Sequence, residues 1–421
     1  MQLDLLATEL ILLISDHLSS QPDINALACT SRRFHDILNP VLYQYNVQNH
    51  ESSALSWALA EGENKTAEYC LDAGGVYPSK CLGYFYYWGR PRFSYCKPLF
   101  LAYRYRRMYL DTLGISKPSI CDGPNECYQL GFPSSRLASR SVDKYDAVIS
   151  LMIDRGIDVN DAANDMTANA RGWTVLSLAV YHRDERLVHL LIRKGANVHT
   201  RYSDEQTVLH MAAEVEEENI VRALLEQNVD VQASRTDGLT ALHFGVTNEA
   251  ITRLLLEAGA DTEAKTNKLC TSLHAAAIFG SAGSLRALIE HGASIDARDD
   301  QRSTSLHWAS GDGRGEVARI LIENGANIDA KNDDGMSPLH FASQSLVPME
   351  SKHLPPGGEH AAVARLLIDR GADLAGRDIF GRNALDIASS ERGPRNRTEA
   401  RRIADMIRDK LRRDGIVRLT L

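Results

Sequence analysis

Apolar side chains recur along most of the chain in short helical groups, each followed by a glycine. In the segments Leu285 to Ile289 and Val317 to Ile322 they fall at the spacing of one helix face. Gly292 and Gly325 follow these segments, and glycine accepts the left-handed conformation in which helices often end. The pattern predicts many short helices that stop and restart at regular intervals.

A second landmark recurs in phase with the glycines. Leucine–histidine pairs begin at positions 209, 242, 273, 306 and 339, so successive steps are 33, 31, 33 and 33 residues. A threonine or serine stands two residues before each leucine, where it can cap a helix. Two helices per period cannot bury all their apolar surface alone, so the pattern predicts a stack in which each unit packs on its neighbours.

The residues around each pair, as in Thr240-Ala241-Leu242-His243 and Ser337-Pro338-Leu339-His340, resemble the T-P-L-H-x-A signature of ankyrin repeats. The resemblance implies an all-α ankyrin-repeat solenoid in which the histidine hydrogen-bonds between units. It also implies that protein partners lie across a concave face built from turn tips and first helices. By register, the residues expected on that face are Asp204, Gln206, Glu214, Asp237, Leu239, Lys268, Gln301, Ser303, Asp334 and Met336.

The repeats divide the chain into segments. Residues 171–376 carry the regular units, and residues 377–421 form a terminal capping unit whose second helix is expected over Glu399 to Leu411. Residues 50–160 contain weaker units with a Cys/Tyr-rich insertion at about 114–141. About nine units are expected in all.

Residues 1–47 follow a different pattern, with leucine or isoleucine every fourth residue and then two further short helical groups. A three-helix unit this small buries little surface, so it is expected to dock on a partner or on the first repeat. The segment resembles an F-box, as found in F-box/ankyrin proteins of filamentous fungi. The resemblance implies binding to a Skp-type adaptor of a cullin ubiquitin ligase through Leu6, Leu10, Ile14, Leu18, Leu27, Phe34 and Leu38.

Composition and charge restrict the expected cellular compartment of the protein and the classes of partner that it can bind. The formal net charge of -8 argues against general nucleic-acid binding by the whole chain. The sequence shows no signal peptide and no membrane-spanning run, and its 7 cysteines fit a reducing compartment, so a cytoplasmic or nuclear protein is expected.

Several patterns permit a second interpretation. The regular histidines are interpreted as structural and not as metal ligands, and no zinc is expected at Cys81, Cys96, Cys121 and Cys127, which lack a C-x-x-C pair. The tyrosines and arginines between 84 and 109 are interpreted as a packing helix in preference to a nucleic-acid platform. The glycine-rich stretch 311–315 is expected to be a turn between helices and not a nucleotide site.

No catalytic motif is found, so the chain is expected to be neither an enzyme nor a cofactor protein. Two functions remain open. The first is a substrate-recruiting receptor of a Skp-cullin-F-box ubiquitin ligase; the second is an ankyrin scaffold whose N-terminal segment only caps the first repeat.

Overall fold

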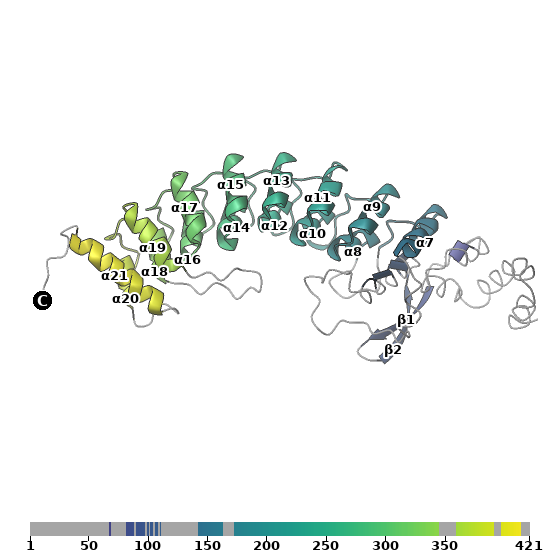
Figure 1. The fold of residues 1–421 in the computed structure, drawn as a ribbon, viewed down its shortest axis with the longest axis horizontal. Helices are drawn as coiled ribbons and strands as arrows, with labels where there is room; N and C mark the ends of the chain where they lie inside the picture. Colours follow the sequence, from purple (N-terminus) through teal and green to yellow (C-terminus); the bar gives the residue numbers. More distant parts are fainter. Residues whose placement is uncertain are drawn as a thin grey trace, which may run out of the picture. The chain divides into compact units, whose positions relative to one another are not determined.

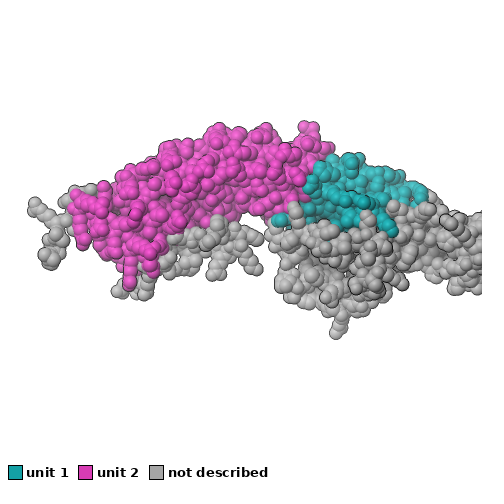
Figure 2. All heavy atoms as spheres, viewed as in Figure 1, with its two compact units in different colours: residues 1–203 teal, residues 204–421 magenta. Residues whose placement is uncertain are grey.

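The computed structural model describes residues 67–68, 81–87, 90–96, 99–100, 102–103, 106–107, 110, 142–162, 172–344, 359–390 and 397–413. The chain divides into unit 1, Met1–Ser203, and unit 2, Asp204–Leu421 (Figure 2). The expected F-box-like segment, residues 1–47, lies outside the described residues.

Unit 2 is built from helix pairs that follow one another in chain order (Figure 1). A short 3-10 turn, Ser203–Glu205, precedes them. The pairs are α10 (Val208–Glu214) with α11 (Glu218–Leu225), α12 (Ala241–Gly245) with α13 (Glu249–Glu257), α14 (Ser272–Phe279) with α15 (Ala282–Glu290), α16 (Ser305–Gly311) with α17 (Gly315–Glu323), α18 (Pro338–Gln344) with α19 (His360–Asp369), and α20 (Ala384–Ser389) with α21 (Arg397–Arg413).

The pairs form two layers. The first helices α10, α12, α14 and α16 lie in one layer, and the second helices α11, α13, α15 and α17 lie in the other (Figure 1). The leucine of every Leu-His pair is fully buried, as expected of a stack in which each unit packs on its neighbours. The helix-turn-helix stack expected from the repeats is therefore confirmed.

Local sequence explains where the helices begin and end. Thr240 stands in extended backbone before α12 and forms a capping box with His243. After α13 the chain leaves the helix at Gly259, whose φ of 88° lies in the left-handed region. The expected terminal helix is also present, since α21 covers the predicted segment and extends it by two residues at each end.

Unit 1 contains β1 (Cys81–Tyr87) and β2 (Arg90–Cys96), which pair antiparallel with Cys81 opposite Cys96. The packing helix expected over residues 84–109 is therefore wrong for the part up to Cys96. Aromatic residues favour strands, and they occupy four consecutive positions at the end of β1 and alternate positions in β2, whereas the prediction followed the helical period of the later units. The described part of unit 1 also includes the helices α7 (Val142–Asp154), α8 (Val175–Tyr181) and α9 (Glu185–Arg193).

The predicted packing role holds for two residues farther along this stretch. Tyr103 is buried, and its hydroxyl donates a hydrogen bond to the Leu178 carbonyl at 3.2 Å. Arg106 is also buried, and its guanidinium pairs with Asp184 and, at 2.6 Å, with Asp146. A buried arginine needs such partners, so these pairs fix the residue within unit 1.

None of the described helices is both long and apolar enough to cross a bilayer.

Candidate functional site

Six equivalent turns precede the first helices of unit 2. They comprise residues 204–206, 236–239, 267–270, 300–303, 333–336 and 379–382, and we call them the turn row. Counted from the helix cap, the four residues of each turn occupy positions 1 to 4, with position 4 next to the cap; the first turn lacks position 1. Because the turns repeat in register, a residue in one turn can be compared directly with its equivalents in the others.

Backbone hydrogen bonds join each turn to the next. The amide of Thr236 donates to the Asp204 carbonyl at 3.0 Å, and the amide of Asn267 donates to the Asp237 carbonyl at 2.9 Å. The same bond, from position 1 to position 2 of the preceding turn, recurs at 2.9, 3.0 and 2.9 Å along the rest of the row. The turns are therefore held to one another and not only to their own helices.

The regular histidines attach the turns to the stack. In the unit of Thr240, Nδ1 of His243 accepts hydrogen bonds from the Thr240 amide and hydroxyl at 3.2 and 2.9 Å. Since an amide can only donate, the ring proton must sit on Nε2, which donates to the Cys270 carbonyl of the next turn at 3.2 Å. His210, His274, His307 and His340 make the same contacts, so position 4 of each following turn is fixed.

This arrangement requires neutral histidines. Burial lowers the pKa of His243, His274 and His340, and it lowers the pKa of His307 to about 4. The backbone hydrogen bond at Nε2 acts in the opposite direction and is outweighed by burial. The interpretation of these histidines as structural residues is thus consistent with their hydrogen bonds to backbone carbonyls and capping residues.

Position 3 of every turn has left-handed backbone. Glycine occupies it at 238, 335 and 381, with φ of 82°, 71° and 75°. Glu205, Leu269 and Arg302 occupy it elsewhere, with φ of 60°, 55° and 59°. A side chain in this conformation costs about 1–2 kcal/mol, so three of the turns carry strain that glycine would avoid.

The structure places the predicted partner-binding residues in three environments. Asp204, Glu214, Lys268, Gln301 and Asp334 are exposed, and Gln206, Asp237 and Leu239 are half-buried. The expectation of exposure is wrong for Ser303 and Met336, whose exposed fractions are 0% and 5%.

The physical reason lies in position 4 of the turn. From the second turn onward the carbonyl at position 4 accepts the histidine bond, and in the units of Ser303 and Met336 the side chain also contacts the next unit. The Ser303 hydroxyl oxygen lies 3.5 Å from Nδ2 of Asn332. Met336 accordingly packs with Phe341 and Ile387 in a buried cluster. Position 4 therefore contributes to packing in these two units.

Sequence reasoning missed three residues of the turn row. Leu269, Ile379 and Phe380 are the exposed large apolar side chains of the described residues, with exposed fractions of 46%, 62% and 70%. These residues could have been recognised from the sequence, because aligning the repeats places Leu269 where other turns have glycine. The same alignment places Ile379 and Phe380 opposite polar residues such as Asp333 and Asp334.

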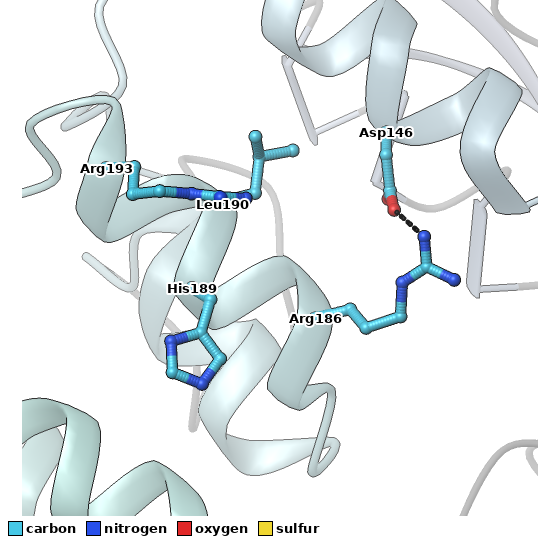
Figure 3. A pocket seen from close by; sticks show the side chains of 5 residues that line it. All are labelled: Asp146, Arg186, His189, Leu190 and Arg193. Carbon is cyan, nitrogen blue, oxygen red and sulfur yellow. Dashed lines mark ion pairs between the residues drawn. The ribbon is translucent and has the colours of Figure 1, made fainter.

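A separate hollow of about 320 Å³ lies between α7 and α9 in unit 1, lined by Asp146, Arg186, His189, Leu190 and Arg193 (Figure 3). Arg186 points across it to Asp146 at 3.3 Å. Because Asp146 also pairs with the buried Arg106, the charges facing this hollow are largely paired within the protein.

The described residues contain no group of three or more His, Cys, Asp or Glu side chains arranged to hold a metal ion. Cys121 and Cys127 lie outside them, so the absence of zinc stays a prediction. The glycine-rich stretch 311–315 connects α16 to α17, as expected of a turn between helices.

The chain was compared with protein families, curated proteins and solved structures. A family model described as "Ankyrin repeats (3 copies)" matches residues 176–266, 209–299 and 273–347. No curated protein matches the chain. One similar solved structure is the human ASB11 ankyrin repeat domain, which is 26% identical, with a TM-score of 0.46; the match covers 54% of this chain and 96% of that chain. Another is the ankyrin repeat domain of Bcl-3, "a unique member of the IkappaB protein family", which is 27% identical, with a TM-score of 0.43; the match covers 55% of this chain and 97% of that chain. The helix pairs over residues 176–347 are therefore ankyrin repeats, which are protein–protein interaction modules.

Proposed function

We propose that this chain is a substrate-recruiting receptor of a Skp-cullin-F-box ubiquitin ligase. In this proposal the turn row and the adjoining first helices bind the target protein. The N-terminal segment, residues 1–47, binds the Skp-type adaptor. The two activities are carried by separate parts of the chain, so each can be tested alone.

Target binding is supported by one observation, the contrast within each turn between a fixed backbone and a variable exposed side chain. The amides and histidines hold every turn in place before any partner arrives. A surface that is already ordered loses little conformational entropy on binding, which favours affinity. The side chains at positions 1 to 3 differ from turn to turn, which gives the surface an individual pattern.

Adaptor binding is supported by the residues of the N-terminal segment. The series Leu6, Leu10, Ile14 and Leu18 resembles the F-box pattern and presents more apolar surface than a three-helix unit can bury by itself. These residues lie outside the described part of the chain, so this half of the proposal depends on the sequence alone.

A pull-down with a purified Skp-type adaptor and cullin tests the ligase role. The wild-type chain should retain both, and the double variant L10D/I14D should lose them, because two unpaired carboxylates would be buried in the contact. Lys268→Ala, a change on the turn row of unit 2, is the matched control and should bind normally. A wild-type chain that never retains the adaptor would contradict the ligase role.

The alternative, a scaffold whose N-terminal segment caps the first repeat, gives a different result. In that case L10D/I14D should accelerate proteolysis near Leu55 and Leu99 without any adaptor being involved. The helical signal of unit 2 should be unchanged in both cases, since repeats contact only their neighbours.

A further inference from the structure

The last helix of unit 2, α21, extends farther than its packing requires (Figure 1). Its last buried side chain is Ile407, and the helix continues through six more residues to Arg413 with none of them buried. The second helices α11, α13, α15, α17 and α19 each end within two residues of their last buried side chain. A helix segment without buried side chains gains little stability from packing, so packing does not explain this extension.

The exposed face of α21 is rich in arginine. Arg401, Arg408 and Arg412 lie within about 40° of one another around the helix axis and form a stripe about 16 Å long. Arg402 and Arg413 lie beside this stripe, and all five side chains are exposed. The helix dipole favours basic residues in the last turn alone, whereas Arg401 and Arg402 lie in the N-terminal half of α21. The dipole therefore does not explain the stripe.

The terminal unit that contains α21 is basic, although the whole chain is acidic. Residues 377–421 include twelve lysines and arginines against seven aspartates and glutamates, in a chain whose formal net charge is -8. Two of these carboxylates are occupied elsewhere in the unit. Asp378 is buried and paired with Arg382, and Asp386 lies 3.9 Å from Arg377. The positive charge of the unit is therefore concentrated on α21.

Ion pairs within α21 leave most of the arginine donors exposed. Three pairs join residues three positions apart: Arg402 with Glu399 at 2.8 Å, Arg408 with Asp405 at 3.0 Å, and Arg412 with Asp409 at 3.4 Å. Each pair uses one of the five N–H donors of the guanidinium, and exposed pairs of this kind contribute little to stability. Arg401 and Arg413 pair with no carboxylate in the part of the chain that the structure describes. An anion can therefore bind these arginines without first breaking a strong contact.

The composition of this face favours phosphate groups as the partner. Arginine binds phosphate through two parallel hydrogen bonds. The exposed large apolar side chains of the described residues are Leu269, Ile379 and Phe380, so α21 offers none for the core of a protein–protein interface. A helix that lies on a membrane needs an exposed apolar face, but the apolar face of α21 is buried against α19 and α20. Interfaces with nucleic acid are polar and positively charged, as this face is.

We propose that the arginine face of α21, made by Arg401, Arg402, Arg408, Arg412 and Arg413, binds the phosphate backbone of a nucleic acid. The stripe covers about five nucleotides of one strand, which rises about 3.4 Å per nucleotide. Phosphate contacts carry no sequence information, so binding should not depend on sequence. The inference goes beyond the proposed function, because it involves neither the target protein nor the Skp-type adaptor.

Fluorescence anisotropy with the full chain and labelled DNA duplexes of about 20 base pairs tests the proposal. The wild type should bind two unrelated sequences equally, with a dissociation constant of about 1–100 μM at about 50 mM salt, and should weaken steeply as salt is added. The variant R401Q/R408Q/R412Q should bind at least about tenfold more weakly. Its slope of log K against log salt should be shallower by about three, because three phosphate contacts are lost.

The matched control is R253Q/R286Q/R319Q, which removes three surface arginines that also pair with glutamates, from α13, α15 and α17. It should change DNA binding by less than about twofold. Glutamine is a good helix former, so both triple variants should keep the helical signal and urea midpoint of the wild type. Loss of binding can then be assigned to the arginines and not to unfolding.

Three results would overturn the inference: the wild type does not bind DNA at about 50 mM salt, the α21 variant binds as the wild type does, or the control loses as much affinity. Two further probes separate phosphate on nucleic acid from other anions. Polyglutamate that competes as well as DNA at equal charge would assign the face to an acidic protein. Binding to phosphatidylserine vesicles without binding to DNA would assign it to a membrane, and either result would also overturn the inference.

Discussion

The repeated interior of unit 2 and its turn row share the same units but use their residues differently. In the interior, Leu209, Leu242 and Leu273 are buried at equivalent positions, and each is followed by a histidine with the same contacts. On the turn row, equivalent positions carry a leucine, an arginine or a glycine. The interior therefore preserves the stack, and the turn row gives each unit its own surface.

This division has an energetic consequence. A change in the interior removes burial or a hydrogen bond that neighbouring units share, so it should destabilise the stack. A change at an exposed position of the turn row, such as Lys268 or Phe380, removes a side chain that contacts mainly solvent, so its effect should appear in binding. The turn backbone is the exception, because it belongs to both regions.

The largest expected effect is acid destabilisation of the interior. His307 has a folded-state pKa of about 4, below its ordinary value of 6.5. Between these two pH values the unfolded chain binds more protons at this histidine than the folded chain does. The contribution of His307 to stability is therefore complete above pH 6.5 and is lost as the pH falls toward 4. His307 alone accounts for about 3 kcal/mol. His243, His274 and His340, whose pKa values are also lowered, should add to this loss.

Urea titrations at several pH values measure this effect directly. The variant His307→Gln should be less stable at pH 7 but should lose less stability than the wild type as the pH is lowered to 4. The same dependence on pH in both proteins would contradict a neutral, buried His307.

A substitution inside the stack should have the next largest effect. Leu273→Asp places an unpaired carboxylate among fully buried side chains and should lower the free energy of unfolding by about 3 kcal/mol or more. Lys268→Ala, on the adjoining turn, should change it by less than about 0.5 kcal/mol. Equal losses in denaturant titration would show that the assigned register is wrong.

The turn backbone should show an intermediate effect. A Cβ at Gly238 would lie 2.7 Å from the Thr266 Cα and 2.9 Å from the Lys265 carbonyl oxygen, both backbone atoms. Gly238→Ala should therefore destabilise unit 2 by about 2 kcal/mol or more. Gly259→Ala is the matched control, because a Cβ there meets nothing within 4 Å and only the left-handed φ of 88° opposes it. Gly259→Ala should lower the free energy of unfolding by about 1 kcal/mol. Thermal melts in which Gly259→Ala is less stable than Gly238→Ala would refute the close approach of neighbouring turns.

The smallest effect should be a gain of stability. Leu269→Gly relieves the left-handed strain and should stabilise the protein by about 0.5–1 kcal/mol. Lys268→Gly, one residue earlier and outside the left-handed region, should instead lose about 0.5 kcal/mol through unfolded-state entropy. Urea midpoints that move in the same direction for both variants would show that position 3 is not strained.

Much of the fold could be predicted from the sequence because the interior repeats. Thr240, Leu242 and His243 recur in register, and that spacing is enough to place caps, buried positions and inter-unit hydrogen bonds. The strands over Cys81–Tyr87 and Arg90–Cys96 were not predicted, because that segment does not repeat and the helical period of the later units was extended to it in spite of its strand-favouring aromatic residues.

The candidate site was predicted less completely. Register alone placed Lys268, Gln301 and Asp334 on the surface, as observed. It failed at Ser303 and Met336, because burial at position 4 depends on packing against the next unit. Leu269 and Phe380 were missed because the prediction followed what the units share, whereas these residues differ from the shared pattern.

One measurement tests the division between interior and turn row most directly. It is the urea midpoint of the wild type, of Leu273→Asp and of I379D/F380D. We expect Leu273→Asp to unfold at a much lower urea concentration and I379D/F380D to keep the wild-type midpoint, because Leu273 is fully buried whereas Ile379 and Phe380 are exposed. Equal losses in the two variants, or a large loss in I379D/F380D alone, would contradict the account.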